Sequence, residues 1–104
     1  MDKEQVIKLV EAYAKVVTQN MVVNKIILYG SYARGNYGKD SDIDVAVVVP
    51  RKSISKNIIE DMAKLFRLRR NISTDIEPVL LIDEKDNSGF LDDVLSYGQI
   101  IYSR

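Results

Sequence analysis

Two apolar runs separated by a glycine-rich segment constrain the fold of this chain more than any other feature. The first run, residues 23–30, reads VNKIILYG, and the second, residues 42–49, reads DIDVAVVV and stops at Pro50. Short apolar runs that are rich in β-branched residues and bounded by Gly, Asn or Pro predict buried strands. The residues between the runs are rich in Gly, Asn and Asp, and they predict a loop with one helical turn.

Helices are predicted on either side of these strands. Apolar residues recur at helical spacing over residues 2–19 and 53–70, and a shorter helix is predicted for 88–97. Asp2 begins a capping-box pattern, and Ser53 is the predicted N-cap of the second long helix.

A third strand is predicted for residues 75–82, and a short last strand for 99–102. Pro78 cannot donate a ladder hydrogen bond, so the third strand should lie at a sheet edge or carry a bulge. The resulting order predicts one domain, residues 1–104, of the α+β class with α/β-like character. We expect a small mixed sheet whose helices cover one face.

Composition excludes several kinds of chemistry. The chain has no Cys and no His, which removes thiol nucleophiles, Ser-His-Asp triads and imidazole-bound zinc. Its 15 basic and 15 acidic residues leave no basic excess, so nucleic acid is not expected as the main ligand. No apolar run is long enough to span a membrane, and the first ten residues do not resemble a signal peptide, so a cytoplasmic location is expected.

The second predicted strand begins with two carboxylates. Asp42 and Asp44 alternate with apolar residues, so both side chains should point to one face, with Cα atoms about 6.5–7 Å apart. Two carboxylates at this spacing can share one or two divalent cations, and their oxygens suit Mg²⁺. The alternative is that two acidic residues at the start of a strand are simply solvated.

Gly30 and Ser31 follow the first predicted strand directly. A glycine turn at this point can present amide groups to a phosphate, and the Ser hydroxyl adds a donor. Ser31 could instead be an ordinary helix N-cap. Arg34 could bind the same phosphate through its planar guanidinium, or it could be a surface charge.

The complete pattern is a strand, Gly30-Ser31, ten residues, and Asp42-x-Asp44. It resembles the signature of the DNA polymerase beta-like nucleotidyltransferase superfamily, and the short chain is similar to its smallest members, the minimal nucleotidyltransferases. This resemblance implies attack of a hydroxyl on the α-phosphate of a metal-bound nucleoside triphosphate. Gly30 and Ser31 would hold the triphosphate. Asp42 and Asp44 would ligate two Mg²⁺ ions, or Mn²⁺ in their place.

The family also has a third carboxylate on the strand that follows the long helix. Asp75 and Glu77 both stand there, and by alternation they share a face. The family pattern of an acid followed by apolar residues selects Glu77, which would bind metal and help to deprotonate the attacking hydroxyl. Asp75 remains the alternative third ligand.

Other polar and aromatic residues have simpler interpretations. The basic run at residues 67–70 should complement the dipole at the end of the second long helix. Tyr29 is predicted to lie in the core, whereas Tyr32 and Tyr37 are candidates to contact a base or an acceptor.

The resemblance implies transfer of AMP from ATP to a hydroxyl. The acceptor would be a tyrosine on a HEPN-type toxin, for which this chain would act as the antitoxin, within a homodimer or hetero-oligomer. The alternative is a catalytically weak or inactive binding module that neutralises a partner by contact. A small-molecule acceptor such as an aminoglycoside is disfavoured, because the chain lacks the length for an added acceptor domain.

Overall fold

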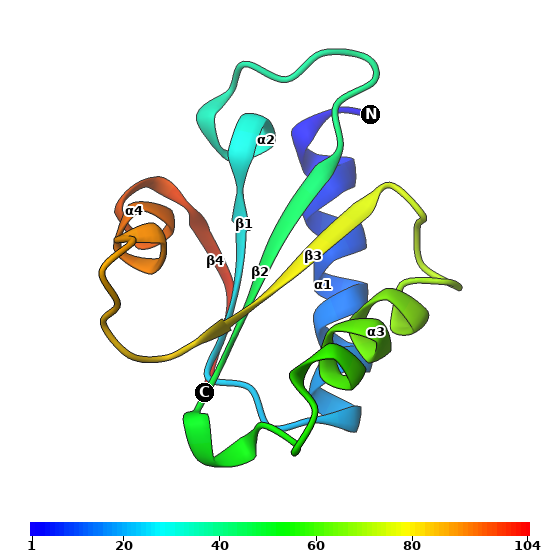
Figure 1. The fold of residues 1–104 in the computed structure, drawn as a ribbon. Helices are drawn as coiled ribbons and strands as arrows, with labels where there is room; N and C mark the ends of the chain where they lie inside the picture. Colours follow the sequence, from blue (N-terminus) through cyan, green and yellow to red (C-terminus); the bar gives the residue numbers. More distant parts are fainter.

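The computed structural model describes residues 1–104, and its centre is a four-stranded sheet flanked by helices (Figure 1). The elements in chain order are α1 (Lys3–Asn20), β1 (Lys25–Tyr29), α2 (Gly30–Arg34), β2 (Ile43–Val49), a 3₁₀ turn (Arg51–Ser53), α3 (Ile58–Leu68), β3 (Ile76–Ile82), α4 (Phe90–Tyr97) and β4 (Gln99–Ser103). The α+β class predicted from the sequence is therefore confirmed.

The sheet is mixed, with the strand order β3-β2-β1-β4. β1 is antiparallel to both β2 and β4, whereas β2 and β3 are parallel. A parallel pair needs a long crossover connection, which here contains α3. β3 forms one edge of the sheet, as predicted from Pro78.

The two faces of the sheet carry separate hydrophobic clusters. The larger cluster of 16 buried residues lies between the sheet and the helices α1 and α3. The smaller cluster of five lies on the opposite face, where α4 packs (Figure 1). It consists of Ile27, Ala46, Val48, Leu91 and Val94.

The expectation that helices cover one face is therefore correct for α1 and α3 but wrong for α4. The sequence carried a signal for this second layer. From Val45 to Val49 every residue of β2 is apolar and buried, which is typical of a strand covered on both faces.

The predicted helix over residues 53–70 begins later than expected. α3 starts at Ile58 and is capped by the side chain of Asn57, not Ser53. Side chains compete for the backbone before this point: the Ser55 hydroxyl donates to the Asn57 carbonyl, and Asp61 accepts from the Ser55 amide. Such local bonds offer the backbone an alternative to helix.

The first helix agrees with its prediction. Asp2 caps α1 in a capping box with Gln5. None of the helices combines the length and the apolar character that crossing a membrane requires.

Gly98 joins α4 to β4 where there is no space for a side chain. A Cβ at this position would lie 2.5 Å from Ile27 Cγ2 and from the Val94 carbonyl oxygen. We expect Gly98→Ala to lower the free energy of unfolding by about 1–3 kcal/mol, the usual cost of overpacking. Gly38→Ala is the control, because a Cβ there is 4.0 Å from its nearest neighbour. Urea unfolding of both variants measures the difference, and equal stabilities would contradict this account of Gly98.

Candidate active site

The parallel register of β2 and β3 places two predicted site residues side by side. Asp44 on β2 is the direct partner of Glu77 on β3. On the other side of β2, Asp44 is the partner of Tyr29 on β1. Residues in register on neighbouring strands point to the same face. Glu77, Asp44 and Tyr29 therefore form a row across three strands, on the face that α4 partly covers.

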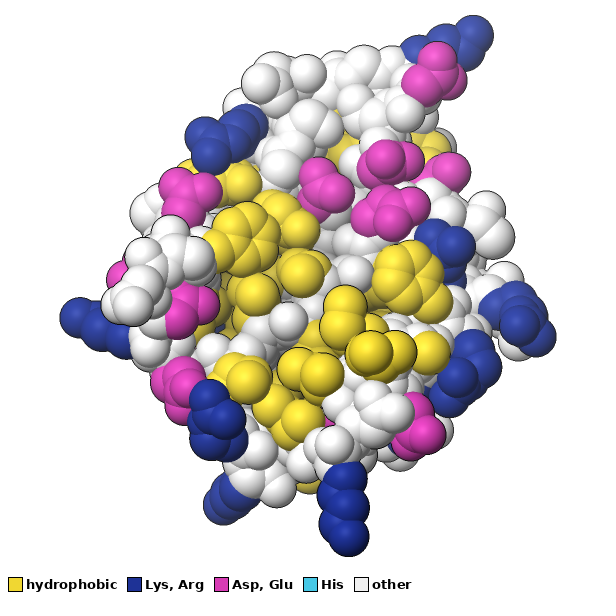
Figure 2. Space-filling view, viewed as in Figure 1, with side chains coloured by type: hydrophobic (Ala, Val, Ile, Leu, Met, Phe, Trp, Pro, Cys, Tyr) yellow, Lys and Arg dark blue, Asp and Glu magenta, His cyan; other side chains and the backbone are white.

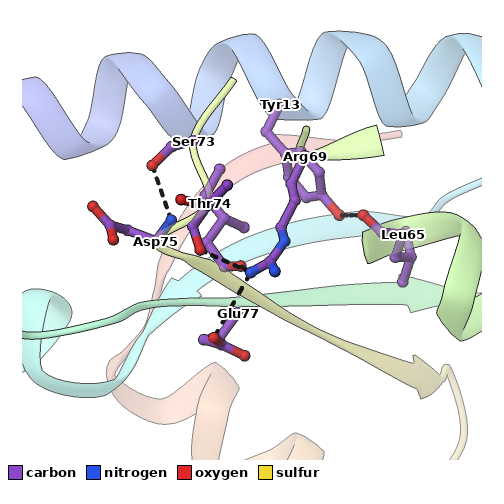
Figure 3. Close-up of polar contacts among 8 residues, drawn as sticks. Tyr13, Leu65, Arg69, Ser73, Thr74, Asp75 and Glu77 are labelled. Carbon is purple, nitrogen blue, oxygen red and sulfur yellow. Dashed lines mark hydrogen bonds and ion pairs between the residues drawn. The ribbon is translucent and has the colours of Figure 1, made fainter. Parts of the chain in front are cut away.

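Asp75 lies outside this row. It precedes β3, and its carbonyl oxygen accepts a hydrogen bond from the Ile43 amide. In Figure 3 its carboxylate points away from that of Glu77. Of the two candidates for a third carboxylate, Glu77 is the one that the register brings next to Asp44.

Asp42 stands just before β2, and Asp44 follows two residues later on the strand. Burial raises the pKa of Asp44 above its usual value, and the negative charges of Asp42 and Glu77 raise it further. Ionised Asp44 therefore lies close to two like charges in a partly desolvated position. A bound cation would relieve this repulsion.

The donor chemistry of Asp42, Asp44 and Glu77 fits a hard divalent cation such as Mg²⁺. Yet no three acidic side chains of the chain lie close enough together to hold a metal ion as they stand. Glu77 is turned toward Arg69, with its Oε1 atom 3.7 Å from Arg69 Nη1. Joint ligation by the three carboxylates thus requires Glu77 to reorient.

Gly30 lies directly over the Asp44 carboxylate. Its φ is +72°, in the region that favours glycine, and a Cβ built on it would overlap the Asp44 side chain. The sequence suggested glycine here for the approach of a phosphate. The structure adds a second reason, which is the closeness of Asp44.

The short helix α2 begins at Gly30, and its N-cap is Tyr29. The interpretation of Ser31 as an N-cap is therefore wrong, and Ser31 lies half-buried in the first turn. Because Ser31 directly follows Gly30, it stands at the same end of the sheet as Asp44.

Tyr97, at the end of α4, is a part of the site that no sequence pattern predicts. The Gly30 amide donates to its hydroxyl at 3.0 Å, and the guanidinium of Arg34 lies 3.6 Å from the centre of its ring. Arg34 also lies 3.8 Å from the carboxylate of Asp93. α4 thus supports the turn that carries Gly30 and Arg34. No local sequence pattern predicts this contact, because 67 residues separate Tyr97 from Gly30.

The tyrosines near the site divide into two groups. Tyr29 is half-buried, packs edge-to-face on Phe90 and has its pKa raised to about 12 by burial, with smaller effects of Asp44, Tyr97 and Glu77. It therefore stays protonated at neutral pH. Tyr32 is buried and stacks on Tyr37 with ring centres 4.4 Å apart. Its suggested contact with a base is therefore wrong.

Arg69 is a second residue whose position the sequence did not predict. It is the C-cap of α3, but its guanidinium reaches over to the start of β3 (Figure 3). There Nη1 donates to the carbonyl oxygens of Thr74 at 2.8 Å and Ile76 at 2.7 Å. The interpretation of the basic run as a partner of the helix dipole is therefore incomplete.

The site lies at an open end of the sheet. The three surface pockets of the chain are lined by other residues, and none includes Asp42, Asp44 or Glu77. Asp42 is exposed, whereas Asp44 and Glu77 are partly buried.

Comparison with known proteins identifies the family. The family model described as polymerase beta, nucleotidyltransferase matches residues 11–104. A protein of Methanocaldococcus jannaschii, named a putative protein adenylyltransferase, is 34% identical over 82 residues, which are 77% of this chain and 79% of that protein.

Two solved structures have a similar fold. One is a protein of Sulfolobus solfataricus described as a putative nucleotidyltransferase, with a TM-score of 0.72 and 22% identity, covering 98% of this chain and 84% of the other. A toxin-antitoxin structure with AMP-PNP has a TM-score of 0.62 and 23% identity, covering 100% and 75%. Since the family model matches nearly the whole chain, this protein belongs to the polymerase beta nucleotidyltransferase family and is a nucleotidyltransferase.

Proposed function

We propose that residues 1–104 form one nucleotidyltransferase domain that transfers AMP from ATP to a hydroxyl group of a partner protein. The observation that carries this proposal is the register that sets Glu77 beside Asp44, under the turn at Gly30. A phosphate-binding turn and a set of carboxylates then share one end of the sheet. Nucleotidyl transfer depends mainly on positioning the reacting groups and neutralising their charge, and this arrangement provides for both.

Each residue has a defined role in this proposal. Asp42 and Asp44 provide oxygen ligands for two Mg²⁺ ions, with Glu77 as the third carboxylate. These ions, when bound, neutralise charge on the phosphates and activate the attacking hydroxyl. Gly30 and Ser31 hold the triphosphate, and Arg34 meets a phosphate through its guanidinium.

The reaction forms a bond between the acceptor oxygen and the α-phosphorus, and it breaks the bond from that phosphorus to pyrophosphate. Glu77 takes the hydroxyl proton as the bond forms. Asp75 is not assigned a role, because it lies outside the row of Asp44 and Glu77. Tyr29 stays protonated and packs against Phe90 rather than moving a proton.

The nature of the relatives supports a protein acceptor and an adenine nucleotide. The relative from M. jannaschii is named a putative protein adenylyltransferase, and one structural neighbour is a toxin-antitoxin structure with AMP-PNP. We therefore propose that the chain is an antitoxin whose acceptor is a tyrosine on a HEPN-type toxin, in a homodimer or hetero-oligomer. The cytoplasm remains our prediction for its location.

An exposed apolar surface next to the site supports a protein partner. Figure 2 shows hydrophobic side chains gathered over the middle of this view, with acidic side chains at one end. A pocket lined by Ile58, Leu81 and Leu91 joins α3, β3 and α4 across this surface. Met62 and Phe66 continue from Ile58 at helical spacing, and both are about 40% exposed.

We refer to this surface as the apolar face; it comprises Ile58, Met62, Phe66, Val79, Leu81 and Phe90. It adjoins the carboxylates, because Arg69 contacts both the Phe66 ring and Glu77. The occupant that we propose is the partner protein that bears the acceptor. Docking on the apolar face would bring its hydroxyl to the open end of the sheet.

A second candidate is a binding module that neutralises its partner without catalysis. The observation in its favour is that Glu77 faces Arg69 and does not join Asp42 and Asp44 in a formed metal site. The apolar face would serve this function equally well. The two candidates differ in whether the partner is modified.

AMP transfer to the partner separates the two candidates. We expect incubation with ATP, Mg²⁺ and the protein encoded by the adjacent gene to add one or more AMP units, measured as intact mass. Asp44→Asn should lower the rate at least 100-fold, because it removes a charged metal ligand. Asp40→Asn is the matched control, since Asp40 is an exposed aspartate in the loop that precedes β2. A tight complex without any gain in mass would favour the binding module.

The closeness of Gly30 to Asp44 gives a test of nucleotide binding. Gly30→Ala and Gly35→Ala both place alanine at a positive φ, which should cost about 1 kcal/mol of stability in each variant, and the overlap with Asp44 adds to the cost for Gly30→Ala. Only Gly30→Ala displaces the Asp44 carboxylate, because nothing lies within 4 Å of a Cβ at Gly35. We expect at least tenfold weaker binding of Mg²⁺-ATP for Gly30→Ala alone, measured by calorimetry. Equal affinities of the two variants would contradict this geometry.

The electrostatics of Asp44 predict a stability gain on its neutralisation. Its raised pKa means that ionisation of Asp44 opposes folding, and this cost appears as the pH rises above about 4. In EDTA at pH 7, Asp44→Asn should raise the free energy of unfolding by only a few tenths of a kcal/mol, because solvent screens this partly exposed carboxylate, and the gain should vanish below pH 4. Chemical unfolding at both pH values measures it. The result that contradicts this account is a variant less stable than the parent at pH 7.

A further inference from the structure

Arg69 is a cation fixed by the fold. Its Nη1 atom donates to two backbone carbonyls, those of Thr74 and Ile76, at 2.8 and 2.7 Å. Its side chain is only 22% exposed, and its guanidinium carbon lies 4.9 Å from the centre of the Phe66 ring. A planar guanidinium held at several points has little freedom to move. The positive charge therefore stays at the start of β3.

Glu77 is held much less firmly. Its carboxylate lies 3.7 Å from Arg69, beyond hydrogen-bond distance, and its side chain is 46% exposed. An exposed ion pair of this kind contributes little stability. Glu77 can therefore turn away from Arg69 at small cost, whereas Arg69 cannot follow it.

The same carboxylate is next to Asp44 in the register. Glu77 thus stands between a fixed cation on one side and a pair of aspartates on the other. These aspartates have no basic partner of their own among the ion pairs of the chain. A divalent cation that arrives at Asp42 and Asp44 competes with Arg69 for Glu77, and the positive charge of Arg69 opposes its binding.

We propose that Arg69 is a positioning residue that holds Glu77 until a divalent cation binds at Asp42 and Asp44, so that metal binding and release of Glu77 from Arg69 are coupled. This inference rests on the proposed function, which assigns these carboxylates to the metal. The two roles of Arg69 are separable. Its bonds to Thr74 and Ile76 stabilise β3, and its charge controls Glu77 and the metal.

Mn²⁺ affinity of the full chain without nucleotide, measured by electron paramagnetic resonance, tests the coupling. Arg69→Gln removes the charge and should bind Mn²⁺ roughly threefold to tenfold more tightly, as loss of one nearby unit charge implies. Arg69→Lys keeps the charge but loses the guanidinium, so it should lose stability with Mn²⁺ affinity close to that of the parent. Arg70→Gln is the matched control, because Arg70 is an exposed neighbour. Mn²⁺ binding by Arg69→Gln that is no tighter than that of Arg69→Lys overturns the proposal.

A measurement on the unmodified chain covers the case in which the Arg69 variants do not fold. Titration with Mg²⁺ should shift the guanidinium nitrogen resonances of Arg69 as Glu77 leaves, while those of Arg70 stay in place. Unchanged Arg69 resonances at saturating Mg²⁺ would overturn the inference.

Asp44→Asn distinguishes failure of the inference from failure of the proposed function. If Asp44→Asn leaves Mn²⁺ affinity unchanged, no metal binds at these carboxylates and the proposed function fails. If Asp44→Asn abolishes Mn²⁺ binding but neither Arg69→Gln nor the Mg²⁺ titration gives the expected result, only the role of Arg69 is lost.

Discussion

The parallel register between β2 and β3 is the constraint on which the site depends. Apolar packing fixes it, because Ile43 on β2 and its partner Ile76 on β3 are both fully buried against α1 and α3. A slip by one residue would turn every β3 side chain to the other face. Glu77 would then enter the larger core, and its carboxylate would be desolvated without a partner. The position of the polar row across the sheet is thus set by the hydrophobic residues that adjoin its members along each strand.

Features with a local cause could be predicted from the sequence. Alternation of apolar and acidic residues predicts that Asp42 and Asp44 share a face, and Pro78 predicts an edge strand. Both predictions need only the geometry of one strand. Helical spacing extends back through Ile54 and so predicts too early a start for α3, because hydrogen bonds around Ser55 and Asn57 hold that segment out of the helix.

Contacts between different helices and strands could not be predicted from the sequence. Tyr97 reaches the Gly30 amide only because the connection after β3 places α4 on the second face of the sheet. Arg69 ends a helix in a run of basic residues, and nothing in that run distinguishes it from Arg67 or Arg70. Its contact with Glu77 depends on the turn between α3 and β3, which aims the side chain along the strand. Hydrophobic periodicity indicates which face of a single helix or strand is buried. Each of these contacts instead joins two elements, so periodicity does not predict it.

Elsewhere in the chain a carboxylate is neutralised by a basic side chain, so the carboxylates without such a partner are informative. Arg51 bonds Glu84 and lowers its pKa, although both side chains are exposed. Asp44, by contrast, is partly buried among like charges, under a glycine held at a positive φ. Both features are unfavourable for folding, and they occur at the same place. Folded proteins tend to retain such unfavourable features at functional sites, at the expense of stability. Arg69 compensates Glu77 from one side only, and no basic side chain forms an ion pair with Asp42 or Asp44. The division of charge between β2, β3 and the end of α3 therefore supports the proposed cation site.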